Sequence, residues 1–357
     1  MTFSLTPYHG IFTAAPTGQA AHKPDFAQVP QRIGDDLCRL AGAGAIVAVS
    51  TVAGGVSASA SFILTFDNGR RLFVKGSHPG DQSHGAANLR GECMAYRNID
   101  LLRDCAPPFC GMVHADHGDD NGWWLGAWEA VETSASAYNA DALFAMLDDV
   151  QRYEVPAQAG LAVASAHPYL SQFMTDTYKW QRLRGDAQRA QKFAQCFDDA
   201  PAALQWLSAN SDKLCALQAR ASTFAWRLGL MHGDLRCDNY IYGALPASPA
   251  RWYMIDWANA ADGPLAFDRV MLAASLCAQG ACTVTDALAF AQGDLDAEEI
   301  RLMLVMQAGY FADQIYRAPP AAMPRLRPVQ KAMFAGLLAL LDAAEVVAAP
   351  PAGPLAQ

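Results

Sequence analysis

The chain is organised around two short stretches, LMHGDLRCDN (residues 230–239) and WYMIDW (residues 252–257). In the first, Asp234 stands two residues after His232 and five residues before Asn239. In the second, an apolar run that predicts a buried strand ends near Asp256. Either motif alone is common, because most Asp residues in such positions cap helices or form turns. Their order and their apolar flanks favour a shared functional site.

The residue types at this predicted site suit phosphoryl transfer. That reaction needs a carboxylate that accepts the proton of an attacking hydroxyl, and oxygen ligands that hold Mg²⁺ on a triphosphate. Asp234 suits the first task, and Asn239 with Asp256 suits the second. The two stretches therefore predict a site for the transfer of a phosphoryl group.

A segment of small side chains, GGVSASAS (residues 54–61), separates two β-rich runs upstream. Backbone N–H groups in such a segment can approach phosphates closely, because no large side chains intervene. A loose hairpin without this role is the alternative, since the spacing Gly-x-Gly-x-x-Gly is absent. Asp-Asn-Gly at 67–69 then predicts a hairpin turn. It leads into a strand over 71–75 that ends in Lys75.

These features together resemble the aminoglycoside phosphotransferase and choline kinase family, whose fold is similar to that of protein kinases. The resemblance covers residues 30–345 and is specific at five places: Lys75, Glu92, Asp234 with Asn239, Asp256, and the Gly-Pro turn followed by Asp268. It implies an α+β, bilobal architecture, with a small antiparallel-sheet N-lobe and a larger, mainly helical C-lobe. The small-residue segment departs from the protein-kinase pattern by having Ser in place of Gly, which leaves open the Ser that contacts phosphate.

The resemblance also assigns roles to single residues. It implies that Lys75 holds the α- and β-phosphates of ATP, that a helical Glu92 orients Lys75 by an ion pair, and that Asp234 is the catalytic base. His232 and Asp268 are expected to support the loops. The expected nucleotide contacts are Gly54, Gly55, Ser57, Lys75, Glu92 and, at a hinge, the backbone of Glu129 and Val131, and the expected Mg²⁺ ligands are Asn239 and Asp256.

Arg236 is a second catalytic candidate, two residues after Asp234. Its charge either stabilises the phosphate during transfer or pairs with Asp238 at the surface. The sequence favours neither role.

Composition limits the class of protein. At 357 residues the chain is long enough for two lobes, since single cores stop growing at about 250–300 residues. The net charge of -9 argues against a dedicated nucleic-acid binder. Nine scattered cysteines without a close CxxC pair indicate reduced thiols. No apolar run reaches the roughly 18–20 residues of a membrane span. We therefore expect a cytoplasmic protein without membrane or nucleic-acid partners.

We expect four segments: an irregular leader (1–29), a nucleotide-binding lobe (30–131), a catalytic and acceptor-binding lobe (132–347) and a mobile tail (348–357). Apolar residues three and four apart predict long helices over 177–197 and 202–228. The aromatic residues of this region either line an acceptor pocket or, as is more common at helical spacing, belong to the core. They are Tyr178, Trp180, Trp206 and Trp226.

The expected reaction is the Mg²⁺-dependent transfer of the γ-phosphoryl group of ATP to a hydroxyl of a small molecule. Aminoglycosides, choline-like alcohols, amino acids and sugars are all acceptors on this scaffold, and membership does not choose among them. A protein kinase is disfavoured, because Trp257 stands where protein kinases place Phe-Gly and no Ala-Pro-Glu segment follows. The alternative is a catalytically idle kinase-fold protein that binds a nucleotide or a partner. Neither the acceptor nor the oligomeric state follows from the sequence.

Overall fold

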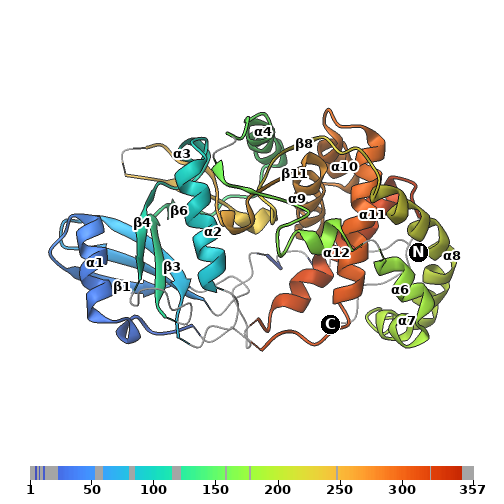
Figure 1. Ribbon diagram of the computed structural model, residues 1–357, viewed down its shortest axis with the longest axis horizontal. Coiled ribbons are helices and arrows are strands. Elements are labelled where there is room, and N and C mark those ends of the chain that lie inside the picture. The colour runs from blue at the N-terminus through green and yellow to red at the C-terminus, as the bar shows by residue number, and fades with distance from the viewer. Residues whose placement is uncertain are drawn as a thin grey trace.

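The computed structural model shows two lobes (Figure 1). The residues that it describes are 5, 8, 11–12, 23–52, 59–79, 85–114, 122–156, 159–176, 178–246, 248–321 and 323–347. The predicted phosphate contacts Gly54, Gly55 and Ser57 and the predicted tail at 348–357 lie outside these residues. One lobe is built on an antiparallel sheet and the other is mainly helical, so the predicted α+β, bilobal fold is confirmed.

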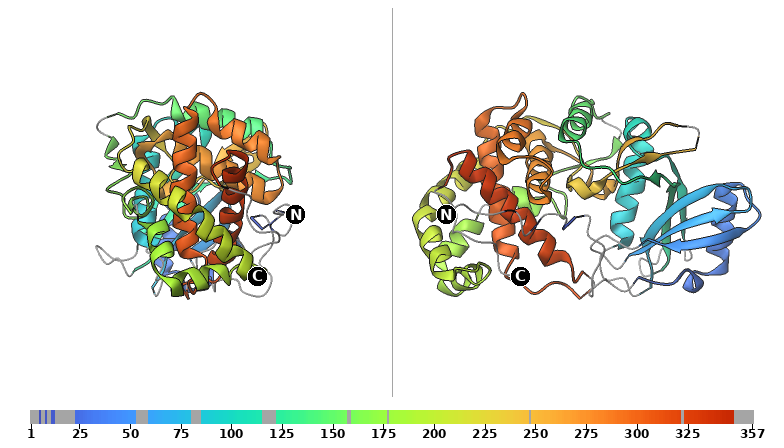
Figure 2. Two further views of the ribbon diagram at one scale, coloured as in Figure 1. Left: turned by 90° about the vertical axis from the view of Figure 1, so that its right-hand side faces the viewer. Right: turned by 180° about the vertical axis from the view of Figure 1, so that it is seen from behind.

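The smaller lobe is a five-stranded antiparallel sheet in the order β1-β2-β3-β5-β4. Side chains alternate between its two faces. Phe62 and Val74 face the outer side, where they pack with Ile33 and Leu37 of α1. Helix α2 lies on the face toward the larger lobe (Figures 1 and 2). The elements are α1 (Gln31–Ala41), β1 (Ile46–Thr51), β2 (Ala60–Phe66), β3 (Arg71–Ser77), α2 (Gly85–Asn98), α3 (Leu102–Cys105), β4 (Phe109–His114) and β5 (Trp124–Glu129).

The predicted turn between β2 and β3 is present. Gly69 adopts a φ of 81°, which a residue without a Cβ reaches at little cost. Asn68 Oδ1 accepts a hydrogen bond from the backbone N–H of Arg70 at 2.9 Å, which closes the turn. This hairpin fixes the register that places Lys75 opposite Ser61.

Two small sheets carry the functional loops of the larger lobe. The sheet β10-β9-β6 and the sheet β7-β11-β8 are each three-stranded. One loop (232–239) joins β8 to β9, and the other (255–260) joins β10 to β11. Because β9 and β10 pair directly, with Tyr240 opposite Met254, the end of the first loop is held next to the start of the second. The strands are β6 (Glu132–Thr133), β7 (Ala162–Val163), β8 (Leu228–Met231), β9 (Tyr240–Ala244), β10 (Arg251–Met254) and β11 (Ala261–Pro264).

Helices make up the rest of the larger lobe, as the end-on view in Figure 2 shows. Helix α9 is at its centre and is buried at every position from Leu265 to Ala278, because α10, α11, α12 and β8 all pack on it. The helices are α4 (Ala140–Gln151), α5 (Ser171–Met174), α6 (Lys179–Gly185), α7 (Ala187–Ala194), α8 (Ala200–Ala221), α9 (Leu265–Gln279), α10 (Val284–Gln292), α11 (Ala297–Gln314) and α12 (Leu326–Ala343).

The two long helices predicted over 177–197 and 202–228 are wrong in their extent. The first is divided into α6 and α7 at Asp186, which has an extended backbone and accepts hydrogen bonds from the N–H groups of Gln188 and Arg189. Such N-capping starts a new helix. The second ends at Ala221, and Leu228 instead begins β8, which pairs with β11. At the end of this predicted helix, hydrogen bonding between β8 and β11 therefore overrides the helical periodicity of the sequence.

The leader contacts both lobes. Tyr8 is buried in the core of the larger lobe, and the Phe12 N–H donates to Gln279 Oε1 at 3.3 Å. Further along, Asp25 caps a 3-10 turn (Phe26–Gln28), and the Phe26 ring meets Phe62 of β2 edge-on at 5.2 Å. The predicted irregular leader thus contacts the larger lobe near residues 8–12 and the smaller lobe near residue 26.

None of the described helices combines the length and the apolar character that crossing a membrane requires. All nine cysteines are free thiols.

Candidate active site

Lys75 of β3 is the centre of the site. Its ammonium lies 2.8 Å from Glu92 Oε2 and 2.7 Å from Asp256 Oδ1. Burial alone would lower the pKa of Lys75, but the two carboxylates outweigh it and hold the pKa well above its usual range. The structure therefore brings three predicted site residues together around one permanent positive charge.

Glu92 is placed by the close packing of α2 on the turn after Asp256, the 3-10 helix η5 (Trp257–Asn259). Gly91 makes this approach possible, since a Cβ there would stand 2.9 Å from the carbonyl oxygen of Ala258. The Glu92 side chain is 3% exposed. Burial raises its pKa to about 7, although Lys75 and a hydrogen bond from the Trp257 backbone act in the opposite direction.

Asp256 has a left-handed backbone, with a φ of 69°. This conformation is uncommon for a residue other than glycine and is often found at functional sites. The neighbouring Ile255 N–H donates to the carbonyl of Asn239 at 2.9 Å, which ties the two loops together. Lys75 lowers the pKa of Asp256, so this carboxylate stays ionised.

Asp268, near the N-terminus of α9, holds the loop that carries Asp234. It is fully buried and accepts hydrogen bonds from the backbone N–H groups of His232 at 2.6 Å and Gly233 at 3.0 Å. Gly233 has a φ of 81°, and a Cβ there would stand 2.5 Å from the carbonyl oxygen of Asn259. The loop thus needs glycine both for its backbone conformation and for its closeness to the second loop.

His232 joins the two loops through its ring. Nδ1 accepts the N–H of Asp234 at 3.3 Å, and Nε2 lies 2.8 Å from the carbonyl oxygen of Ile255. The proton must therefore sit on Nε2, which donates to that oxygen. Burial lowers the pKa of His232 to about 4, so the ring is neutral. Both ring nitrogens of His232 are therefore used to hold the two loops together.

Arg236 forms an ion pair with Asp234. Its Nη1 lies 2.6 Å and 2.8 Å from the two Asp234 carboxylate oxygens, and its Nε donates to Asp238 Oδ1 at 3.0 Å. Burial raises the pKa of Asp234 to about 6, and Arg236 pulls it down. Of the two roles that the sequence left open, the pairing with Asp238 is present. The contact with Asp234 is an additional one that neither role included.

Asn239 completes the group. Its Nδ2 donates to the backbone carbonyl of Asp234 at 2.6 Å, which orients the amide and leaves its oxygen for another partner. Asp256 likewise binds Lys75 through Oδ1 and keeps Oδ2. Two oxygen donors from neighbouring loops suit Mg²⁺, which takes few protein ligands and completes its shell with phosphate and water. The described residues include no group of three His, Cys, Asp or Glu side chains that would hold a metal alone.

The predicted hinge lies where the chain leaves β5. The side chain of Glu129 is bound to Arg70 at 2.5 Å. The N–H of Glu129 donates to Pro108 O at 2.9 Å, and that of Ala130 donates to Arg71 O at 3.1 Å. The backbone N–H groups of Glu129 and Ala130 are thus already used within the protein. Val131 is the hinge residue whose N–H has no acceptor among the described residues.

The aromatic residues considered for an acceptor pocket do not line the pocket found here. Trp180 is fully buried and donates from Nε1 to Val305 O at 3.0 Å, and Trp206 packs edge-on against it. Trp226 packs against Phe224, and Tyr178 is exposed. The interpretation as core residues is therefore confirmed for Trp180 and Trp206.

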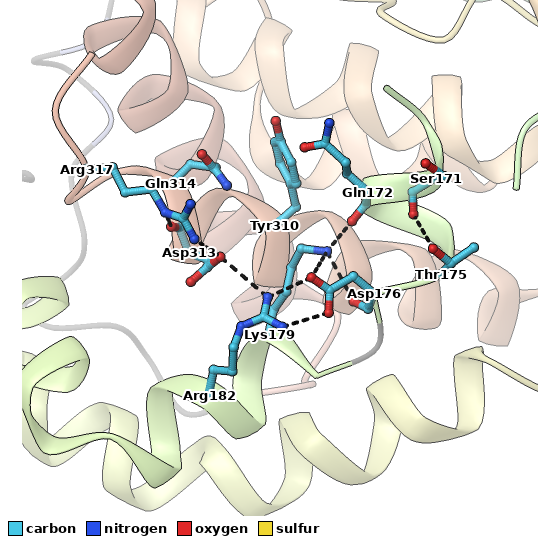
Figure 3. A pocket seen from close by; sticks show the side chains of 10 residues that line it. All are labelled: Ser171, Gln172, Thr175, Asp176, Lys179, Arg182, Tyr310, Asp313, Gln314 and Arg317. Carbon is cyan, nitrogen blue, oxygen red and sulfur yellow. Dashed lines mark hydrogen bonds and ion pairs between the residues drawn. The ribbon is translucent and has the colours of Figure 1, made fainter. Parts of the chain in front are cut away.

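A polar pocket of about 300 Å³ lies instead between α5, α6 and α11 (Figure 3). Arg182 points between two carboxylates, binding Asp176 at 2.8 Å and 2.7 Å and approaching Asp313 at 3.5 Å. Burial raises the pKa of Tyr310 to about 12, and the negative charge of Asp234 acts in the same direction. The lining residues are Ser171, Gln172, Thr175, Asp176, Lys179, Arg182, Tyr310, Asp313, Gln314 and Arg317.

Sequence reasoning missed this pocket because its residues come from two segments, 171–182 and 310–317, which are 128 positions apart in the chain and form no local motif. It also missed Lys23, which donates to Ser61 Oγ beside Lys75. A lone lysine in a segment without periodicity carries no signal of its own.

Comparison with known proteins gives these observations a family. Residues 48–303 match the model of the phosphotransferase enzyme family. The structure of spectinomycin phosphotransferase APH(9)-Ia in complex with ADP and spectinomycin is similar, with a TM-score of 0.56 at 12% identity over 89% of this chain and 98% of that chain. A GDP complex of a mutant aminoglycoside 2'-phosphotransferase-IIIa gives 0.50 at 14% identity over 87% and 95%. No curated protein matches the sequence significantly.

At such identities the structural likeness shows the fold alone. The family match is independent of it and spans most of the chain, including both loops, Lys75 and Glu92. The chain therefore belongs to the phosphotransferase enzyme family.

Proposed function

We propose that this protein transfers the γ-phosphoryl group of ATP to a hydroxyl of a small molecule, with Mg²⁺. One observation carries the proposal: the Lys75 ammonium is held between Glu92 and Asp256, which belong to different lobes. This arrangement fixes a cation next to an ionised carboxylate on an adjacent loop. Such a pair suits a phosphate group and its metal ion, because opposite charges are needed at neighbouring points.

The chain offers separate contacts for each part of the nucleotide. Lys75 would bind the phosphates, kept in place by Glu92. At the hinge, the Glu129 carbonyl oxygen and the Val131 N–H would meet the edge of the adenine. These groups lie on β3 and at the end of β5, strands that pair directly, so one ligand can reach both.

Asn239 and Asp256 would hold Mg²⁺, which neutralises phosphate charge when bound. The hydrogen bond from Asn239 Nδ2 to Asp234 O aims the amide oxygen away from the loop backbone. The lowered pKa of Asp256 keeps its carboxylate ready for a cation at neutral pH. Lys75 already occupies one of the two Asp256 oxygens, so this carboxylate would be shared between the lysine and the metal.

Asp234 would accept the proton of the acceptor hydroxyl. Its carboxylate is buried, and a buried carboxylate tends to hold its proton. Arg236 counters this tendency by lowering the pKa, and so keeps Asp234 ionised. For the hydroxyl to approach, Arg236 must give up one of its two contacts with Asp234. We expect its guanidinium then to face the transferring phosphate.

The pocket in Figure 3 would bind part of the acceptor. Arg182 pairs with Asp176 and Arg317 pairs with Asp313, and Lys179 adds one further positive charge to the wall beside Asp176. The remaining hydroxyl and amide groups suit a polar compound rich in hydroxyls. The ligand of the similar spectinomycin phosphotransferase complex, spectinomycin, supports a polar small molecule.

A transfer assay tests the proposal. Purified protein is incubated with Mg-ATP and a panel of hydroxylated compounds, including aminocyclitols, choline-like alcohols, hydroxyl amino acids and sugars. We expect ADP release that depends on one acceptor class and that both Lys75→Met and Asp256→Ala abolish. Tight Mg-ATP binding without transfer to any class would instead favour the catalytically idle kinase-fold protein.

A further inference from the structure

Lys23, which lies before the first helix, reaches the end of the β1–β2 hairpin where β1 ends and β2 begins. Its ammonium donates to the carbonyl of Val52 at 2.9 Å and to Ser61 Oγ at 2.6 Å. Ser61 Oγ in turn donates to Val52 O at 3.1 Å. Three residues after Lys23, Phe26 packs on Phe62, whose side chain lies on the opposite face of β2. This contact fixes the position of the segment that carries Lys23. Lys23 is therefore an ordered part of the hairpin and not a loose surface side chain.

The contact puts Lys23 on the same face of the sheet as Lys75. Ser61 and Lys75 are directly opposite partners on β2 and β3, and partners in register point to the same face. That face is the one toward α2, where Lys75 meets Glu92 and Asp256. A lysine from the leader thus stands next to the lysine of the nucleotide site.

The electrostatic environments of the two lysines are opposite. Lys75 has two carboxylate partners, whereas the partners of Lys23 among the described residues are the neutral oxygens of Val52 and Ser61. Burial and the charge of Lys75 lower the pKa of Lys23 to about 8. A partly buried cation beside another cation is unfavourable unless an anion arrives. An ammonium has three N–H donors, and two of those of Lys23 are in use.

We propose that Lys23 is a second phosphate-binding lysine, whose third N–H and positive charge contact the triphosphate of the bound nucleotide alongside Lys75. This inference rests on the proposed nucleotide site and adds to it a residue from the leader. A hydrogen bond from a charged group contributes about 1.5–3 kcal/mol, which corresponds to about 10- to 150-fold in affinity.

A purely structural role for Lys23, as a tie that closes the hairpin, makes different predictions. The tie depends on hydrogen bonds to Val52 and Ser61, and the phosphate contact depends on charge. Lys23→Gln keeps a donor of similar length and removes the charge. Lys23→Arg keeps the charge. Ser61→Ala removes one hydrogen bond of the tie and leaves the lysine charged.

The test measures the affinity of each variant for Mg-ATP, ADP and adenosine by displacement of a fluorescent ATP analogue. We expect Lys23→Gln to bind ATP at least tenfold more weakly, to lose less for ADP and to bind adenosine like the wild type. Lys23→Arg should retain most of the ATP affinity, and Ser61→Ala should stay within about threefold. Lys192→Ala, on α7 of the larger lobe, is the surface-lysine control and should match the wild type.

Equal losses for ATP and adenosine in Lys23→Gln, or the same loss in Ser61→Ala, would overturn the phosphate role and leave the tie. Thermal unfolding of each variant shows whether it has folded. If Lys23→Gln does not fold, the comparison of Lys23→Arg with Ser61→Ala still decides, because only the phosphate role makes the second variant near normal. Failure of the wild type to bind ATP would instead overturn the proposed function itself.

Discussion

At the scale of single residues, the partners of Arg236 are set by the two acidic residues beside it. Arg236 stands between Asp234 and Asp238, and it is the strongest influence that opposes the effect of burial on the Asp234 carboxylate. The motif around Asp234 predicts it as the catalytic base, and that role remains our proposal. The contact with Arg236 was not predictable, because two neighbouring acidic residues can each take the guanidinium and only the fold decides how they share it.

His232 gives a prediction for pH. Its folded pKa of about 4 lies below the unfolded value of about 6.5, so the folded state binds fewer protons. The stability from the neutral ring is complete above pH 6.5 and is lost as the pH falls toward 4. Relative to His232→Gln, the wild type should lose roughly 3 kcal/mol of unfolding free energy between pH 7 and 4. Denaturant unfolding at several pH values measures this. A difference that does not shrink in acid would contradict a buried neutral ring.

Gly233 gives a second prediction at this scale. Gly233→Ala combines a strained φ with a clash against Asn259 O, so it should displace the loop that carries Asp234 and lower turnover by at least a hundredfold. Gly160→Ala is the matched control, because Gly160 has a φ of 67° with nothing within 4 Å of an added Cβ. That variant should lose about 1 kcal/mol of stability and keep its activity. Equal activity in the two variants would show that closeness to the second loop is unimportant.

Among the elements, α2 has the most direct influence on the site, because it carries Glu92 to Lys75. Gly91→Ala improves helix propensity but places a Cβ 2.9 Å from Ala258 O, so α2 must move away from η5. We expect ATP affinity to fall at least tenfold. In α1, Gly34→Ala meets its nearest atom at 4.0 Å and should stabilise the protein by about 0.5–1 kcal/mol without affecting binding. Binding assays and thermal unfolding of both variants make the comparison. Unchanged affinity in Gly91→Ala would contradict the role of α2.

The elements that could be predicted from the sequence are those with a clear pattern or a strong turn. The hairpin of β2 and β3 belongs to this group. Helix α9 was not predicted, because a helix buried on all sides has no apolar stripe. The short strands β8 and β11 lack a pattern of their own and exist through pairing with each other. The pocket in Figure 3 was missed for a similar reason, since its walls meet only in the folded chain.

On the scale of the whole molecule, one ion pair joins the lobes at the site. Lys75 comes from the sheet of the smaller lobe, and Asp256 follows β10 of the larger lobe. The leader also connects them, with Tyr8 in the larger lobe and Lys23 at the β1–β2 hairpin. A boundary between the lobes near residue 132 remains our proposal. A nucleotide that binds at Lys75 would therefore contact both lobes. In the proposed reaction, this contact would bring the phosphate to the acceptor, which the larger lobe would bind.

The division of labour between Asp234 and Asp256 can be measured most directly with two variants. Calorimetry gives their affinity for Mg-ATP, and initial rates with the identified acceptor give their turnover. Asp256→Ala removes a proposed metal ligand and should lose both. Asp234→Asn keeps the shape of the side chain but cannot accept the proton, so it should bind Mg-ATP nearly as well as the wild type while turnover falls by about 10²–10⁴-fold. If Asp234→Asn lost nucleotide binding as completely as Asp256→Ala, or kept full activity, Asp234 would not be the catalytic base.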